Sequence, residues 1–414
     1  MKFSSTRRPS RDLTLISNAR LADVLAEDGH DVTLLQLDFG PDYEQKFSKS
    51  ARLWAETFEW PARYTAFRPA AFAKKIFSEG SLISDYWQMI GWQDRFMDAC
   101  EHIIASNELV KKVKDEKFDV YIGEQLDLCG SGLSHALGIP IHVMMHSCPL
   151  MQHLGAYRTT RVFRKHYGAD FPHVGKIVGD SPLIFVNVEE FVDMPRPTYQ
   201  NFVYIGGLGL HDTKNLSLGD AHSKEDLRIT GPFQKMREAT KNLSNVFLTS
   251  WAPQPAILNH PRLQLFCTHG GYNSIVESAR FGVPLALVGF FGDQPLNAMT
   301  VERNGWGLSI PKGALLRPSD EFETKVKRIL ADPSFKTAAK RTQRLITTKP
   351  MSAEQRVVAY MRFLEQNGGR LPELQSEGRN LSFVEFYNLD LLLLAAASSL
   401  ACLPLSRKPK VKTS

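Results

Sequence analysis

The stretch LFCTHGGYNSIVESARFGVPLALVGFFGDQPLNA, residues 265–298, contains two apolar runs that each lead into a loop of polar or glycine residues. The first run ends at Cys267, and the loop Thr-His-Gly-Gly is followed at once by an amphipathic segment. The second run, Val283–Val288, leads to the polar pair Asp293 and Gln294. Two short apolar runs with one amphipathic segment between them predict two parallel strands joined by a helix over 273–281.

The same alternation continues through the rest of the chain. In the first half, apolar runs at 32–37, 120–122 and 141–145 alternate with amphipathic segments, and the runs PLIFVNV and NFVYIGG follow. In the second half, NVFLTS and WGLSI flank the opening stretch. Strands that alternate with helices form parallel sheets. The sequence therefore predicts an α/β protein with two doubly wound domains, joined near residue 205, and a cleft between them. Helices near 320–330 and 353–366 are expected to close the second domain.

The loop after the first apolar run has the chemistry of an anion site. Its glycines, Gly271 among them, let backbone N–H groups approach a ligand closely, and a helix N-terminus favours negative charge. His269 can donate to a phosphate oxygen, and Asn273 and Ser274 stand in the first turn of the helix. A phosphate is the ligand that such a set of donors favours.

Other polar side chains lie where a nucleotide sugar would need them. Glu277 follows Asn273 by one helical turn, and its carboxylate can accept from two vicinal hydroxyls of a ribose. Asp293 and Gln294 can bind sugar hydroxyls, and upstream the run SWAPQ offers the aromatic face of Trp251 and the amide of Gln254. All of them follow predicted strands, where open α/β sheets bind ligands.

Each of these residues also has a purely structural interpretation. Asn273 and Asp293 could cap helices, Glu277 could be solvated, Trp251 could belong to a core, and a single histidine after a strand is often an ordinary loop residue. Only their joint occurrence at these spacings favours a site for a nucleotide sugar.

Residues 251–298 as a whole resemble the donor-binding segment of the UDP-glycosyltransferases, most closely the animal UDP-glucuronosyltransferases of invertebrate type. The segments FDVYIGEQLDLCG, VNVEEFVDMPRP and YIGG resemble that family too, so the similarity extends over roughly residues 20–414. It implies a GT-B fold. The domains that it implies are an acceptor-binding domain over 1–205, a UDP-sugar-binding domain over 206–368, a juxtamembrane segment over 369–387, a transmembrane helix over 388–406 and a basic cytosolic tail over 407–414.

The resemblance also assigns roles to the polar residues. Trp251 would stack on uracil, Gln254 would contact the base or ribose, and Glu277 would hold the ribose. The diphosphate would be bound by His269, Gly271, Asn273 and Ser274, and the sugar by Asp293 and Gln294. The co-substrate would be UDP-glucuronate or UDP-glucose, and the acceptor a small lipophilic hydroxyl compound. No cofactor and no metal ligand from the protein are expected, and the chain has no Asp-x-Asp.

The implied reaction is attack of an acceptor hydroxyl on the anomeric carbon, with inversion, and it needs a base. In the family this base is a histidine near the N-terminus, oriented by a carboxylate after a later strand. Glu124 in DVYIGEQ matches the carboxylate, with a solvated loop acid as the alternative. The position of this histidine falls near residue 14, which is a threonine here, so the histidine is absent. His30 belongs to a different family position and does not replace it.

Two segments depart from the family pattern. The first strand of the acceptor domain is expected to be missing, together with the segment that carries the histidine. The interval from Gly219 to Trp251 is shorter than in the family, so a core strand of the donor domain is expected to be lost as well.

The C-terminus has features of a membrane anchor, but the N-terminus lacks the signal peptide that would bring the chain to the membrane. Residues 391–406 carry no charge and a basic tail follows, which favours a membrane span over a buried hairpin or core helix. The tail KVKTS has the dilysine pattern of a retrieval signal for the endoplasmic reticulum. The N-terminus has no apolar segment of a signal peptide. The sequence thus predicts a single-pass protein of the endoplasmic reticulum membrane with a truncated or altered start, or else a cytosolic, tail-anchored protein.

Composition narrows the class of protein further. The formal net charge is +6, but eight cations stand in the terminal segments and the rest is nearly neutral, so no nucleic-acid partner is expected. The cysteines form no CxxC pair and no zinc spacing, which makes a disulfide framework or structural zinc improbable. Three Asn-x-Ser triplets, at Asn215, Asn242 and Asn380, matter only if the chain enters the secretory lumen.

Three functions are compatible with these features to different degrees. The first is a membrane-bound UDP-glycosyltransferase, which the donor segment favours. The second is a catalytically impaired, membrane-anchored UDP-sugar-binding relative that forms homo- or hetero-oligomers with active homologues, which the missing histidine favours. A cytosolic dehydrogenase is remote, because no G-x-G-x-x-G follows an early strand.

Overall fold

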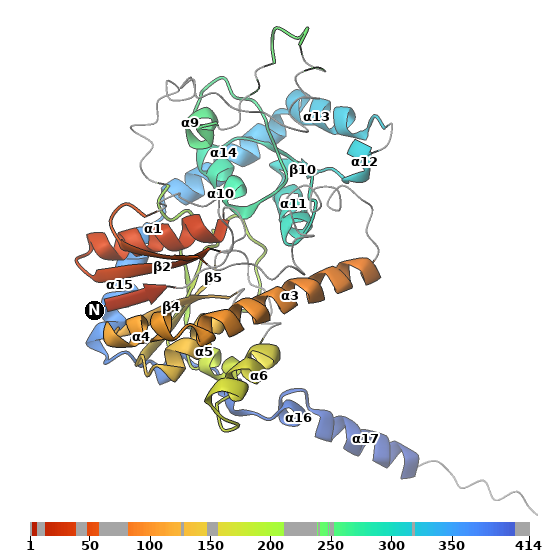
Figure 1. The fold of residues 1–414 in the computed structure, drawn as a ribbon. Coiled ribbons are helices and arrows are strands. Elements are labelled where there is room, and N and C mark those ends of the chain that lie inside the picture. Colours follow the sequence, from red (N-terminus) through yellow and green to blue (C-terminus); the bar gives the residue numbers. More distant parts are fainter. Residues whose placement is uncertain are drawn as a thin grey trace, which may run out of the picture.

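The computed structural model in Figure 1 describes residues 2–5, 13–38, 48–57, 82–125, 128–146, 156–210, 238, 241–246, 248, 252–316 and 319–401. It contains two parallel sheets with helices packed on them, as the alternation of apolar and amphipathic segments predicts. The α/β fold class is therefore confirmed.

The first sheet has seven strands in the order β3-β2-β1-β4-β5-β6-β7, and all neighbours are parallel. Its strands are β1 (Lys2–Ser5), β2 (Asp31–Asp38), β3 (Arg52–Thr57), β4 (Val120–Glu124), β5 (Ile141–His146), β6 (Ile184–Val186) and β7 (Phe202–Tyr204). The strand order reverses between β1 and β4, which makes the sheet doubly wound. The carboxyl ends of β4, β5 and β6 consequently lie at one edge of the sheet.

The expectation that the first strand is missing is wrong. The segment Lys2–Ser5 forms β1 at the centre of the sheet, with Phe3 opposite Val32 of β2 and opposite Val120 of β4. Four residues are enough, because the pairing with two neighbours satisfies the backbone hydrogen bonds. The first helix, α1 (Leu13–Glu27), follows β1 along the chain.

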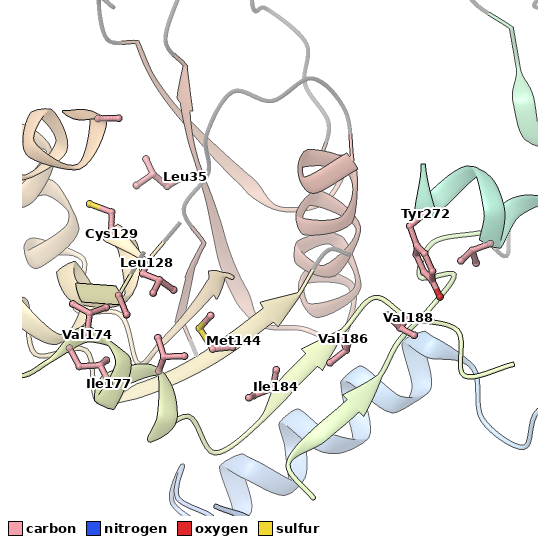
Figure 2. Close-up of a cluster of buried hydrophobic side chains, with 14 of the residues drawn as sticks. Leu35, Leu128, Cys129, Met144, Val174, Ile177, Ile184, Val186, Val188 and Tyr272 are labelled. Carbon is pink, nitrogen blue, oxygen red and sulfur yellow. The ribbon is translucent and has the colours of Figure 1, made fainter. Parts of the chain in front are cut away.

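Helices cover both faces of the first sheet. The other helices of this domain are α3 (Leu82–Ala105), α4 (Asn107–Asp115), α5 (Cys129–Ala136), α6 (Ala156–Tyr167) and α7 (Val174–Gly179). Figure 1 shows α1 on one side of the sheet and α3 to α6 on the other. The core on the second side includes Met144, Ile184 and Val174, and it continues into the second domain through Tyr272, which points towards Val188 in Figure 2.

A disulfide joins two helices of this second layer, although the cysteine spacing had made disulfides improbable. Cys100 of α3 is bonded to Cys129 at the start of α5, with their Cα atoms 5.5 Å apart. The two residues are separated by 29 positions and both are buried, so no local motif in the sequence announces the pair. Cys267 is a free, exposed cysteine.

The second sheet has three described strands in the order β10-β9-β8, again parallel. They are β8 (Phe266–Thr268), β9 (Leu285–Leu287) and β10 (Gly307–Ser309), and the helices around them are α9 (Gln254–Leu258), α10 (Tyr272–Phe281), α11 (Gln294–Arg303), α12 (Gly313–Leu316), α13 (Glu321–Ala331) and α14 (Pro333–Thr347). Gly282 ends α10 in the left-handed conformation with φ of +64°, so β9 follows within three residues. The shortened interval between Gly219 and Trp251 lies largely outside the described residues.

Helix α15 (Ala353–Gln366) corrects the predicted domain division. The sequence places it in the second domain, but Val357, Met361 and Leu364 are buried in the core of the first, together with α1 and the sheet. Arg356 also donates from Nη1 to the carbonyl oxygen of Tyr204, at the end of β7. The chain therefore returns to the first domain after completing the second.

The C-terminal part consists of short turns, η3 (Pro372–Leu374) and η4 (Glu377–Asn380), and two helices, α16 (Phe383–Phe386) and α17 (Leu389–Ala401). Figure 1 shows α17 projecting from the body, and Leu391–Leu394 are largely exposed, so α17 is not a core helix. No helix among the described residues is both long enough and apolar enough to cross a membrane. The transmembrane helix predicted over 388–406 is therefore not found, and residues 402–406 lie outside the described part of the chain.

Candidate functional site

The loop between β8 and α10 forms the centre of the candidate site. Gly270 has a φ of +86°, which lets the chain turn from the strand into the helix. Gly271 is the N-cap of α10, and a Cβ at this position would lie 2.7 Å from Nε2 of His269. The imidazole of His269 therefore lies directly against the start of α10, with no room for a side chain between them.

A second loop, between β9 and α11, is tied to the first by one amide. Nδ2 of Asn297 donates to the carbonyl oxygen of Gly270 at 3.0 Å and to Oδ2 of Asp293 at 2.8 Å. The structure thus brings His269 and Asp293 into the same neighbourhood. Asn297 was missed in the sequence, although its position one helical turn after Asp293 is the signal that could have found it.

The two titratable groups of this neighbourhood have shifted pKa values. Desolvation by partial burial lowers the pKa of His269, and the nearby charge of Asp293 partly opposes this shift. Desolvation raises the pKa of Asp293, while the hydrogen bond from Asn297 and the charge of His269 act against it. His269 is therefore a neutral donor near pH 7, although its side chain remains open to solvent on one side.

Three further predicted residues form one hydrogen-bonded group. Nε2 of Gln254, at the start of α9, donates to Oε2 of Glu277 at 2.7 Å and lies 3.2 Å from Oγ of Ser274. Glu277 is only 8% exposed, so the alternative of a solvated surface acid is wrong. Burial raises the pKa of Glu277, and the bond from Gln254 and the charge of Arg20 oppose that shift.

Asn273 connects the site to the first domain. Its Oδ1 accepts from Nδ2 of Asn187, which follows β6, at a distance of 3.1 Å. Its own Nδ2 is buried without a hydrogen-bond partner among the described residues. Next to it, the hydroxyl of Tyr272 accepts from the backbone N–H of Glu189 at 2.9 Å, and desolvation raises the pKa of this phenol well above its usual value.

Two predicted residues have contacts outside this group, and a third lies outside the described residues. Gln294 is 5% exposed, and its Oε1 accepts from the backbone N–H groups of Phe290 and Phe291, so in this structure it braces the loop. Trp251 lies outside the described residues. Glu124 belongs to the first domain, at the end of β4, where it is 4% exposed and accepts from the backbone N–H of Gln125. The alternative of a solvated loop acid is therefore wrong for Glu124 as well.

The position expected for the family histidine lies in α1. Residue 14 is in the first turn of this helix, and Ser17 and Asn18 follow it by three and four residues. Both are buried, at 2% exposure. Among the described residues, no group of three or more His, Cys, Asp or Glu side chains gathers in a way that could hold a metal ion.

Comparison with protein families gives an extensive match. The family model described as "UDP-glucoronosyl and UDP-glucosyl transferase" matches residues 11–162 and 233–407. The nematode protein ugt-47 of Caenorhabditis briggsae, named provisionally as a UDP-glucuronosyltransferase, is 32% identical, with 94% of this chain and 88% of the relative aligned. The human UDP-glucuronosyltransferase 3A2 is 25% identical, with 84% and 82% aligned.

Solved structures with a similar fold are also found. The spinosyn rhamnosyltransferase SpnG matches with a TM-score of 0.57 at 16% identity, over 88% of this chain and all (100%) of that chain. The glycosyltransferase VinC, solved in complex with dTDP, matches with a TM-score of 0.55 at 19% identity, over 88% and 100%. At these identities the likeness supports the GT-B fold alone.

Proposed function

Because the chain belongs to the UDP-glucuronosyl and UDP-glucosyl transferase family, we propose that it transfers a hexosyl group from a UDP-sugar to the hydroxyl of a small lipophilic acceptor. Glucuronate is the first sugar to test, because relatives carry that name, and glucose is the second. One observation carries the proposal. The loops after β8 and β9 and the start of α9 place His269, Asp293 and the Gln254–Ser274–Glu277 group around α10.

Each part of the donor has a matching group in this proposal. The diphosphate lies at the N-terminus of α10, where backbone N–H groups, His269 and the amide of Asn273 donate to its oxygens. The ribose hydroxyls donate to Glu277, whose carboxylate is oriented by Gln254. The hexose lies towards Asp293, and Gln294 holds the loop that carries it. Trp251 remains the proposed surface for the uracil ring.

In the reaction, the acceptor oxygen attacks the anomeric carbon while the bond from that carbon to the diphosphate oxygen breaks, which inverts the configuration. The proton of the acceptor hydroxyl goes to a base, and the electron pair of the broken bond leaves with UDP. His269 and the start of α10 stabilise the charge that develops on this leaving group. Glu124 is the proposed carboxylate that would orient this base.

A second candidate function follows from residue 14. Thr14 cannot take a proton at neutral pH, and the carboxylate Glu124 alone would be left to accept it. A chain that binds UDP-sugar but turns it over slowly would be a binding partner of active homologues, in homo- or hetero-oligomers. The two functions differ in turnover and agree in donor binding.

The experiment measures both quantities on the same preparation. UDP release from UDP-glucuronate and from UDP-glucose is followed with a phenolic acceptor for the unmodified chain, Thr14→His and the matched control Thr14→Ala, while calorimetry measures UDP binding. A base supplied at the right place raises turnover by on the order of a hundredfold in Thr14→His and leaves Thr14→Ala unchanged. Donor binding without turnover in the unmodified chain supports the partner function. Absence of any UDP binding contradicts both.

We also propose that the body of the protein folds in the lumen of the endoplasmic reticulum. The buried Cys100–Cys129 disulfide supports this location, because disulfides persist in oxidising compartments. The exposed Asn380, in the triplet Asn-Leu-Ser, gives a test. Expressed in animal cells, the chain should carry a glycan that endoglycosidase H removes, and Asn380→Gln should reduce its mass by one glycan. A chain without any glycan would contradict the lumenal location.

A further inference from the structure

We infer that Asn187 is a positioning residue for the donor site: it belongs to the first domain, yet it orients the side chain of Asn273 so that its amide nitrogen faces the diphosphate. This inference rests on the proposed function, because it assumes that a diphosphate binds at the start of α10. It adds a residue of the acceptor domain to a site built otherwise from the second domain.

The position of Asn187 is fixed by the sheet. It directly follows β6, its backbone N–H donates to the carbonyl oxygen of His146 at 2.7 Å, and its side chain is only 4% exposed. From there Nδ2 donates to Oγ of Ser17 in α1 at 3.0 Å and to Oδ1 of Asn273 in α10 at 3.1 Å. Both hydrogens of this amide are therefore used, one towards each helix.

This arrangement fixes which end of the Asn273 amide is available. Because Oδ1 of Asn273 accepts from Asn187, its Nδ2 must point the other way. That Nδ2 is the atom that is buried without a partner among the described residues. A buried donor without an acceptor is unfavourable, and an anionic oxygen that reaches it, after a small shift of the covering atoms, removes this cost. Asn187 thus donates to the amide oxygen of Asn273, and the amide nitrogen of Asn273 is left to donate to a phosphate.

A second contact supports the same face of α10 one turn further on. Arg20, three residues after Ser17 in α1, donates from Nη1 to the carbonyl oxygen of Leu208 at 3.1 Å. Its side chain lies against Gly209, where a Cβ would be 2.7 Å from Cδ of Arg20. The charges of Arg20 and Glu277 interact, and Glu277 follows Asn273 by one turn. Helix α1 therefore supports α10 at two successive levels, both of them at predicted donor-binding residues.

The test replaces Asn187 by its isostere. In Asn187→Asp the carboxylate accepts but cannot donate, so the amide of Asn273 should turn its Nδ2 towards residue 187 and its oxygen towards the diphosphate. Calorimetry should then show UDP binding weakened by about tenfold or more, with the affinity for uridine, which has no phosphate, changed less than twofold. Asn187→Ala removes the group that orients the amide of Asn273 without reversing that amide, so it should weaken UDP binding less. The same variant replaces Asn187→Asp in the test if the aspartate variant does not fold.

Two further variants separate positioning from loss of stability. Asn201→Ala is the matched control, because Asn201 is another buried asparagine of the first domain, with Nδ2 donating to the carbonyl oxygen of Ser181. It should lower stability without changing UDP binding. In Asn273→Ala, adding Asn187→Asp should weaken UDP binding no further.

The outcomes are distinguishable. If the unmodified chain does not bind UDP, the proposed function fails and this inference with it. Two results would overturn this inference alone, provided that the unmodified chain binds UDP. In one, Asn187→Asp binds UDP as tightly as the unmodified chain does. In the other, its affinity for uridine falls as much as its affinity for UDP. An undiminished effect of Asn187→Asp in the Asn273→Ala background would also overturn it.

Discussion

Nε2 of Gln254 lies 2.7 Å from Oε2 of Glu277, although the two residues are 23 positions apart and belong to different helices. The bond joins the start of α9 to the middle of α10. It orients a buried carboxylate, and a carboxylate held in this way can accept from two adjacent hydroxyls. The pair is therefore the part of the site most directly suited to a ribose.

Replacing Glu277 tests this assignment. We expect Glu277→Ala to weaken UDP binding by about tenfold or more, because a hydrogen bond to a charged group is lost. The same replacement should have little effect on the binding of 2′,3′-dideoxy-UDP, which lacks the hydroxyls. Calorimetry with both ligands measures the difference. Glu323→Ala, at an exposed glutamate of α13, is the control that should change neither. An equal loss for both ligands would contradict a ribose contact.

The pKa of His269 predicts how donor binding depends on pH. Because partial burial lowers this pKa below its usual value, the imidazole is neutral at pH 7.5 and gains its proton only as the pH falls. The added positive charge should tighten the binding of UDP-glucose, whose diphosphate does not titrate in this range. We expect a rising affinity between pH 7.5 and 5.5, measured by calorimetry. His269→Gln should abolish most of the rise, and an identical profile in this variant would exclude His269 as its source.

The pKa shift of His269 also affects stability, with a definite sign. A histidine whose pKa is lower in the folded state takes up its proton first in the unfolded chain, so its contribution to stability is complete above the unfolded pKa of about 6.5 and declines as the pH falls. Urea unfolding should therefore show a smaller loss of stability between pH 7.5 and 5.5 in His269→Gln than in the unmodified chain. A larger loss would mean that the sign of the shift is wrong.

The amide of Asn297 offers a test of the contact between the two loops. Asn297→Ala removes the bonds to Gly270 and Asp293 together, so we expect the free energy of unfolding to fall by about 1–3 kcal/mol. Urea unfolding measures this. Asn367→Ala is a suitable control, because Asn367 bonds only within its own helix end in the described contacts and is exposed. Comparable losses in the two variants would argue against a special role for the loop contact.

The disulfide makes a prediction about stability alone. The double variant Cys100→Ser, Cys129→Ser should unfold at lower urea, with a loss of about 2–4 kcal/mol, since the unfolded chain regains the freedom of the closed loop. A reductant should have the same effect on the unmodified chain and none on the variant. Cys267→Ser, at the free cysteine, should leave the transition where it was. Insensitivity of the unmodified chain to a reductant that reaches buried sulfur would contradict the bond.

Much of the fold follows from the sequence because parallel strands are buried on both faces. Such strands appear as short continuous apolar runs, and the runs around 32–37, 120–122 and 141–145 all became strands. The opening stretch gave β8, α10 and β9 with boundaries that differ by one or two residues. The positions of His269 and Asp293 in the loops after β8 and β9 follow for the same reason, while their predicted roles in donor binding remain predictions.

The features that were not predicted depend on contacts between distant residues. β1 is four residues long and has Phe3 as its single apolar residue, so only its pairing with β2 and β4 makes it a strand. Gln294 stays predicted as a sugar ligand, and the two backbone N–H groups from which its Oε1 accepts are a property of the folded loop that the sequence does not indicate. Asn187 stands 86 residues from Asn273, and nothing local in the sequence indicates that the two meet.

The return of α15 to the first domain means that the chain passes between the domains twice, and the two passages are bonded to each other. Glu354 accepts from the backbone N–H of Gly209 at 2.8 Å, and Arg356 donates to Tyr204. A polypeptide that stopped at residue 205 would leave the apolar residues that pack against Val357, Met361 and Leu364 uncovered, and should aggregate rather than fold.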